Sequence, residues 1–176
     1  RRWTVAGRKS SRCATVCKMT EGVRLATLAD LGVLEQFASQ AVAEQVDNRG
    51  GAIWSKRETR NPPFRASLEA DFNNPDQSIW LGVINEVPVG YAVTSVSLLR
   101  TGEVLGTVSD LWVEPEAREV GVGEALINAV IEWCEERNCI GIDSLALPGN
   151  RATKNFFETF GFKARLLTVH HPLDRQ

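Results

Sequence analysis

Apolar residues recur along this chain with two periods, one typical of helices and one typical of strands. Spacings of three and four residues follow Thr27 and Gly121, and they predict two amphipathic helices. Shorter helices are expected at 65–72 and 150–160. Alternating or continuous apolar runs predict strands at 22–26, 78–84, 90–99, 104–113, 140–147 and 162–169, of which the run at 140–147 is expected to be buried.

The connections between these elements predict how the strands pair. The short turns "NEVPV" and "RTGE" join the three central strands, which are therefore expected to be antiparallel neighbours. The segment 47–64 is rich in glycine, proline and charge and predicts a long loop. The fold class is α/β with a mixed sheet: a central, mostly antiparallel sheet with helices on both faces.

Composition limits what this protein can be. The 176 residues suit one domain, and 43% hydrophobic with 24% charged residues is typical of a globular protein. No apolar run approaches the ~20 residues of a membrane span, so no membrane partner is expected. Cys13, Cys17, Cys134 and Cys139 form no zinc-binding pattern with the two histidines, so we expect no metal, reduced thiols and a cytoplasmic location.

The net charge of −2 conceals an uneven distribution. Residues 1–18 hold six basic residues and no acidic one, so the rest of the chain is distinctly acidic. A basic arm could bind nucleic acid or a membrane surface, but Met19 follows it directly, which favours a disordered extension without function. We therefore expect a single domain over 19–176 and no nucleic-acid partner, because phosphate contacts need a basic face.

A glycine-rich loop carries the main chemical signal. In "EPEAREVGVGEAL", residues 114–126, Arg118 and two glycines, Gly121 and Gly123, come directly before a helix. A helix N-terminus offers free N–H groups and partial positive charge, which together bind anions. The loop thus predicts a pyrophosphate site built from the amides of 119–124, with a glycine-bent turn and a solvated arginine as the alternative. It is neither a Walker loop nor a good dinucleotide fingerprint.

Two motifs resemble the GNAT family of N-acetyltransferases. "LWVEPEAREVGVGEAL" is similar to the acyl-CoA-binding motif V-x-P-x-x-[RQ]-x-x-G-x-[GA] of that family, and "NRATKNFFETFGF" is similar to its second signature. The first motif is filled at every position, by Val113, Pro115, Arg118, Gly121 and Gly123. The resemblance covers roughly residues 22–170 and implies a GNAT-like fold.

The resemblance implies acetyl-CoA as co-substrate and a set of residues that hold it. The backbone of Leu111, Trp112 and Val113 would pair with the pantetheine arm, and Asn150 would hydrogen-bond the same arm. As an alternative, Asn150 is a good N-cap for the helix that follows it. The pyrophosphate would lie against Arg118, Glu119, Val120, Gly121, Val122, Gly123 and Glu124.

Catalytic residues are harder to assign. Transfer of an acyl group to an ammonium requires loss of a proton, and a carboxylate can assist. Asp110 is our first candidate for substrate contact or base, because an aspartate in an apolar strand is costly unless it faces a cleft, and Glu114 is the second. Where many GNAT relatives have a tyrosine that protonates the leaving thiolate, this chain has Phe157.

These observations predict an acetyl-CoA-dependent N-acetyltransferase, an acyltransferase that carries an acetyl group directly to an amine of a small molecule or protein. The alternative is a non-catalytic acyl-CoA-binding or sensor domain, which the phenylalanine at position 157 favours. A nucleic-acid-binding module built on the basic arm is a third, weaker hypothesis. Association as a homodimer is left open.

Overall fold

The computed structural model describes residues 20–173. The expectations for the basic segment 1–18, for Met19 and for Cys13 and Cys17 lie outside these residues. No helix between residues 20 and 173 combines the length and the apolar character needed to cross a membrane.

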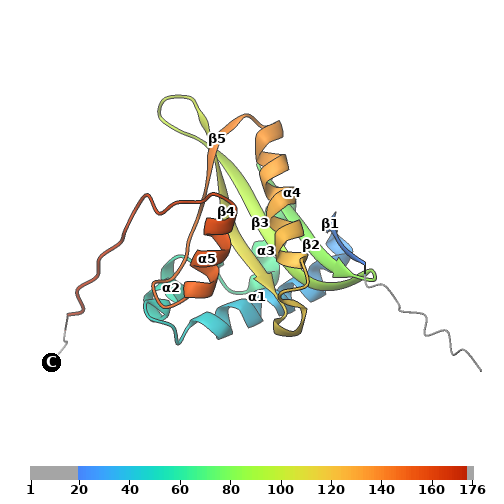
Figure 1. The fold of residues 1–176 in the computed structure, drawn as a ribbon, viewed down its shortest axis with the longest axis horizontal. Helices are drawn as coiled ribbons and strands as arrows, with labels where there is room; N and C mark the ends of the chain where they lie inside the picture. Colours follow the sequence, from blue (N-terminus) through green and yellow to red (C-terminus); the bar gives the residue numbers. More distant parts are fainter. Residues whose placement is uncertain (1–19, 174–176) are drawn as a thin grey trace, which may run out of the picture.

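One mixed sheet of five strands forms the centre of the molecule (Figure 1). The strands are β1 (Glu21–Leu25), β2 (Gln77–Ile84), β3 (Val87–Leu98), β4 (Val104–Val113) and β5 (Cys139–Ser144). They lie side by side in chain order, with β1 to β4 antiparallel and β5 parallel to β4. The predicted mixed, mostly antiparallel sheet is confirmed, as is the antiparallel pairing of its three central strands.

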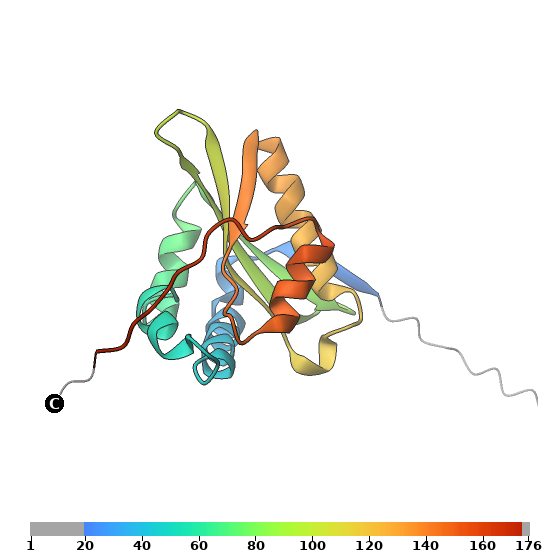
Figure 2. The same ribbon diagram turned by 60° about the vertical axis from the view of Figure 1, so that its left-hand side comes forward.

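Helices cover both faces of the sheet, as the sequence predicted (Figure 2). They are α1 (Leu31–Gln45), α2 (Gly51–Arg57), α3 (Phe64–Phe72), α4 (Val122–Glu136) and α5 (Arg151–Thr159), with two single 3-10 turns, η1 (Leu28–Asp30) and η2 (Pro115–Ala117). Apolar side chains of α1 and α3 pack on one face of the sheet and form one core with it. Those of α4 and α5 pack on the opposite face and form a second core. The side chain of each strand residue therefore faces one of these two cores.

The start of the first helical segment forms a capping box. The Thr27 N–H donates to the Asp30 carboxylate at 2.8 Å, and Arg24 of β1 binds both oxygens of that carboxylate at 2.8 and 2.9 Å. The Arg24 guanidinium holds the pKa of Asp30 well below its usual range. The Asp30 carboxylate thus holds the turn between β1 and α1, because it binds Arg24 before the turn and the backbone of Thr27 within it.

The predicted loop at 47–64 is wrong in its middle, which forms α2. Gly50 takes a left-handed φ of 91°, and a Cβ at Gly51 would lie 2.2 Å from the carbonyl oxygen of Gln45. The two glycines therefore permit a tight corner between two helices, where the sequence pattern indicated only a break.

The predicted last strand is also wrong. Residues 162–173 form neither helix nor strand, because no strand of the described chain pairs with their backbone. The strand at 140–147 exists as β5, but it is the edge of the sheet and is not buried, since Ile140 is 58% and Leu145 64% exposed.

A fork between β4 and β5 opens the sheet. The two strands pair from Val104 with Cys139 to Val108 with Ser144, and β5 ends there. β4 continues to Val113 along β3, after a bulge next to Ser109. Within residues 20–173, positions 109–113 of β4 consequently have a strand on one side only.

Candidate functional site

A narrow cavity of about 60 Å³ lies at this fork. Asp110, Tyr91 and Arg60 reach it from the side of α1 and α3, and Phe157 and Thr153 of α5 reach it from the other side. The fork therefore joins the two faces of the sheet at one point, where a group held on one face can meet a group held on the other.

Backbone groups of β4 are available along the open side of the fork. The Glu114 N–H donates to the carbonyl of Val89 at 2.8 Å, so Glu114 faces β3. Because neighbouring strand residues point their backbone groups in opposite directions, those of Val113 and Leu111 face away from β3, toward the opening. Of the three predicted backbone contacts, Leu111 and Val113 point to the open side and Trp112 points to β3.

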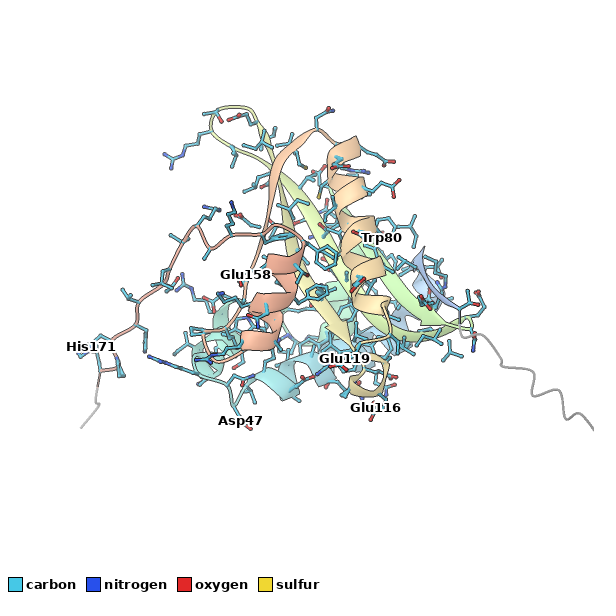
Figure 3. All side chains as sticks on the ribbon, viewed as in Figure 1. Asp47, Trp80, Glu116, Glu119, Glu158 and His171 are labelled. Carbon is cyan, nitrogen blue, oxygen red and sulfur yellow. The ribbon has the colours of Figure 1, made fainter. Side chains whose placement is uncertain are left out.

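The predicted anion site at the start of α4 also has free donors. Within the described residues, the N–H groups of 119–124 make no hydrogen bond, and the first bond of this stretch is donated by Ala125 to Gly121 at 2.9 Å. Glu119 and Gly121 have positive φ angles of 69° and 93°, which turn the chain sharply before the helix. Glu119 lies at the start of α4 in Figure 3.

Gly123 has a packing role that the motif did not predict. A Cβ at this position would lie 3.3 Å from the ring of Phe156 on α5. The glycine therefore allows α4 and α5 to approach closely beside the fork.

Arg118 is held by the protein itself. Its two Nη atoms donate to the Glu44 carboxylate of α1 at 2.8 and 2.6 Å, and its Nε donates to the Val113 carbonyl at 2.9 Å. Trp112 Nε1 donates to the same carboxylate at 2.9 Å. The Arg118 guanidinium lowers the pKa of Glu44. Arg118, which the sequence predicted to contact a phosphate, thus connects the glycine loop with α1 and with the end of β4.

Asn150 performs the role of N-cap. Its Oδ1 accepts a hydrogen bond from the Thr153 N–H at 3.0 Å, which satisfies one free donor at the start of α5. Its Nδ2 lies 3.4 Å from Oε1 of Gln45, at the end of α1. Of the two predicted roles, the structure shows the cap.

Asp110 lies in a network of hydrogen bonds on the α1 and α3 face. Its Oδ2 accepts from Arg60 Nη2 at 2.7 Å and lies 2.9 Å from Ser109 Oγ, and its Oδ1 accepts from the Tyr91 hydroxyl at 2.9 Å. Arg60, whose side chain is 6% exposed, also pairs with Asp71 of α3. The aspartate that was costly in an apolar strand is thereby paired with a buried cation.

Burial controls the ionisation of this network. It raises the pKa of Asp71, and it raises the pKa of Tyr91, whose hydroxyl also faces the negative charge of Asp110. Tyr91 therefore stays protonated and keeps donating to Asp110 over the ordinary pH range.

Asp110 and Glu114 do not share one site. Glu114 lines a second hollow of about 460 Å³ together with Glu44 and Trp112. Their positions are four residues apart, which corresponds to about 13 Å between Cα atoms at the rise of an extended strand. Phe157, in contrast, lines the same cavity as Asp110, so the position of the missing tyrosine does adjoin the fork.

Sequence reasoning missed three residues of this region: Arg60, Tyr91 and Glu44. Arg60 is one of several basic residues in "SKRETRNPPF", and nothing local distinguishes it. The one available signal was Asp110 itself, because a buried carboxylate requires a cation or several donors. A buried Asp110 predicts that a cation or several donors bind it, but it does not predict which residues of the chain supply them.

Comparison with known proteins confirms the family resemblance found in the sequence. The profile of the acetyltransferase (GNAT) family matches residues 46–162, which is more than half of the chain. The chain belongs to the GNAT acetyltransferase family. It is thus an enzyme of the N-acetyltransferase class, and GNAT enzymes use acyl-CoA.

Individual GNAT relatives are more distant. A glucosamine 6-phosphate N-acetyltransferase of Trypanosoma brucei brucei is 31% identical over 116 residues, which cover 60% of this chain and 76% of that protein. A tetramutant of the BH1408 protein from Bacillus halodurans has a TM-score of 0.72 at 20% identity, covering 86% of this chain and 99% of its own.

A third relative was solved with a bound analogue. AAC(6')-Iy, in complex with the bisubstrate analogue CoA-S-monomethyl-acetylneamine, has a TM-score of 0.68 at 16% identity, covering 89% of this chain and 99% of its own. At such identities the solved structures establish the GNAT fold, and they leave the acceptor of this chain undetermined.

Proposed function

We propose that this protein transfers an acetyl group from acetyl-CoA directly to an amine. The observation that carries the proposal is the meeting of free donors at one fork: the N–H groups of 119–124 at the start of α4 and the outward-facing backbone of Leu111 and Val113. The first group suits a pyrophosphate, and the second suits an extended arm that adds to the open side of β4.

The remaining cofactor contacts are proposed as follows. Asn150 Nδ2, which makes one long contact with Gln45, is available to the pantetheine arm while Oδ1 caps α5. Arg118 contributes positive charge next to the loop while it pairs with Glu44. The N–H of Val113 is the nearest candidate to stabilise the oxyanion of the tetrahedral intermediate, since it faces the opening.

Asp110 is proposed as the residue that meets the acceptor amine. Oδ1 accepts one hydrogen bond, from Tyr91, and retains a second lone pair at the cavity. There it can bind the amine and accept its proton directly or through a water. Glu114, in the separate hollow, is the second candidate.

The charge of the network favours a cationic acceptor. Arg60 contributes one positive charge against the two carboxylates of Asp71 and Asp110, and Glu58 also lines the cavity. Because one relative is a glucosamine 6-phosphate N-acetyltransferase, phosphorylated amino sugars must also be compared as acceptors. We therefore expect polyamines or aminoglycosides to be better acceptors than an amino sugar phosphate.

A thiol-release screen with acetyl-CoA tests this function. Polyamines, aminoglycosides, glucosamine, glucosamine 6-phosphate and peptide amines would be compared at equal concentration. Release of CoA that depends on an amine supports the transferase. Tight acetyl-CoA binding without turnover on any amine would instead favour the sensor, which Phe157 at the cavity makes a specific alternative.

The cofactor loop is tested by Gly123→Asp, which adds a negative charge among the free donors. We expect acetyl-CoA to bind at least about tenfold more weakly, because the carboxylate opposes the phosphate and its Cβ crowds Phe156. Each variant is compared with its own melting temperature without ligand. Gly32→Asp, at a position of α1 with no atom within 4 Å of a new Cβ, is the matched control and should bind normally. Equal binding by both variants would contradict the loop assignment.

A further inference from the structure

Tyr91 is the only tyrosine of the chain, and its ring is fixed in the core between the sheet and α1. The residue is 1% exposed, and its ring stacks on Phe37 of α1 with centroids 6.2 Å apart and an angle of 26° between the planes. Phe37 packs in turn on Trp112 of β4, with ring centroids 5.3 Å apart. Because a closely packed ring cannot shift, its hydroxyl is held at one place beside the fork.

The Tyr91 hydroxyl meets Asp110 across two neighbouring strands. Asp110 of β4 pairs with Val93 of β3, and Tyr91 lies two residues before Val93 on the same face of that strand. The hydroxyl therefore reaches diagonally to Asp110 and donates to Oδ1 at 2.9 Å. Burial and the charge of Asp110 raise the pKa of Tyr91, so the hydroxyl keeps the proton that it donates.

The donors around Asp110 are divided unequally between its two oxygens. Oδ2 accepts from Arg60 Nη2 at 2.7 Å and lies 2.9 Å from Ser109 Oγ, so both of its lone pairs have a partner. Among the described residues, Oδ1 accepts from Tyr91 alone, which leaves its second lone pair for the cavity that Asp110 lines. The carboxylate torsion of an aspartate is soft, so Tyr91 is the group that fixes where this free lone pair points.

We propose that Tyr91 is a positioning residue for acyl transfer, whose hydroxyl fixes the Asp110 carboxylate so that the free lone pair of Oδ1 points to the acceptor amine. This role rests on the proposed function, in which Asp110 meets that amine. An N–H bond of the amine breaks and an O–H bond forms at Oδ1, directly or through a water, while Tyr91 keeps its own proton. A carboxylate turned away from this direction reaches the reactive geometry less often, which slows the reaction.

Tyr91→Phe removes the hydroxyl and keeps the ring. With the best amine of the thiol-release screen, we expect kcat to fall about tenfold. KM for acetyl-CoA should not change, because Tyr91 packs on the face of the sheet opposite α4. Thr94→Val is the matched control: Thr94 is fully buried on the same strand, its hydroxyl donates to the Thr107 carbonyl at 3.1 Å, and it does not line the cavity. This variant also loses one buried hydrogen bond, but it should keep the wild-type kcat.

The same substitution in an Asp110→Asn background tests whether Tyr91 acts through Asp110. Asp110→Asn removes the carboxylate and should by itself lower kcat more than Tyr91→Phe does. A positioning residue then has no base to position, so adding Tyr91→Phe should change the remaining kcat less than about twofold. A general loss of packing would instead slow the reaction equally in both backgrounds.

A single carbon atom reports on the hydroxyl without turnover. Because the chain has one tyrosine, protein isotope-labelled at the tyrosine ζ carbon gives one magnetic-resonance signal, which belongs to Tyr91. The signal should move in Asp110→Asn, whose neutral amide is a weaker acceptor than a carboxylate, and it should stay in place in Thr94→Val. In the wild type with free CoA, titration of the amine should also move it, because the amine and the hydroxyl then share Oδ1.

The possible results distinguish this role from the proposed function. Wild-type kcat in Tyr91→Phe, together with a slow Asp110→Asn, would remove the role of Tyr91 and leave the transferase and its base in place. Wild-type kcat in both variants would show that Asp110 does not meet the amine, and Tyr91 would lose its role as well. An equal loss in both backgrounds would mean that the hydroxyl supports the fold only. A tyrosine signal that does not respond to the amine would place the amine away from Oδ1.

Discussion

At the scale of single residues, Phe157 is where this chain departs from the pattern of its family. The ring is 6% exposed, lines the cavity at the fork and packs against Phe156 and Phe162. Its position therefore fits a packing residue as well as a ring that stands where relatives have the acid. Only a hydroxyl added at this ring separates them.

Phe157→Tyr is expected to raise the turnover rate by about tenfold or less. A well-placed acid contributes 10²–10⁴-fold in general, but a thiolate leaves easily and gains less. The measurement is kcat against pH: the wild type should lack an alkaline fall-off caused by a tyrosine acid, and the variant should acquire one. Phe160→Tyr, near the end of the same helix but not at the cavity, should change neither. A steep loss of activity in Phe157→Tyr would mean that the position requires an apolar ring.

Asp30 gives a residue-scale prediction about pH. Arg24 and Thr27 hold its folded-state pKa far below the unfolded value of about 3.9. A depressed pKa means that the stabilisation is complete above about pH 4 and is lost as the pH falls toward the folded-state pKa.

Asp30→Asn should therefore lower the free energy of unfolding by about 1 kcal/mol at neutral pH and by less in acid. Urea unfolding of wild type and variant at a series of pH values measures the difference. If the difference were the same at pH 3 and at pH 7, the ionised carboxylate would not be the source of the stability.

At the scale of elements, Glu44 joins three parts of the site. It belongs to α1, it accepts from Trp112 of β4, and it pairs with Arg118 of the glycine loop. Helix α1 is thereby connected to the loop whose N–H groups we propose bind the cofactor. We expect this contact to fix the direction in which the N–H groups of 119–124 point.

Glu44→Gln should weaken acetyl-CoA binding roughly tenfold, the equivalent of about 1.4 kcal/mol, because a neutral amide cannot hold Arg118 at both Nη atoms. Calorimetry would compare acetyl-CoA with an S-acetyl pantetheine that lacks phosphates, whose binding should change little. Glu35→Gln on the same helix serves as control. Tighter binding of acetyl-CoA by Glu44→Gln would mean that Arg118, once released, contacts the phosphates directly.

At the scale of the whole molecule, Arg60 ties the layer of short helices to the sheet. It follows α2, it pairs with Asp71 of α3, and it reaches Asp110 of β4 across 50 residues of sequence. Its side chain is almost fully buried, so the two carboxylates depend on it.

Arg60→Met should lower the free energy of unfolding by about 3–5 kcal/mol, because it leaves two carboxylates buried without a counter-charge. Urea unfolding measures this. Arg57→Met, at a side chain that is 74% exposed on α2, should cost less than about 0.5 kcal/mol. A stable Arg60→Met protein would show that Asp71 and Asp110 are satisfied by other groups or by water.

The sequence by itself determined most of the fold, and it predicted the glycine loop that we propose holds the cofactor. Periodicity placed β1 to β4 and the helices α1, α3, α4 and α5 within a few residues, because each is fixed by which local side chains can face a core. The turn of the glycine loop was also readable, since the requirement for positive φ at Gly121 is local, whereas the close approach of Phe156 at Gly123 is not.

Only the tertiary structure decided the network around Asp110 and the conformation of residues 162–173. Asp110, Arg60 and Tyr91 meet through contacts between distant segments, and no spacing in the sequence encodes them. The run at 162–169 has the composition of a strand, yet it forms none, because a strand exists only where a neighbour supplies its hydrogen bonds. The local sequence pattern therefore determines which secondary structure a segment can form. The neighbouring segments in the fold determine whether it forms that structure.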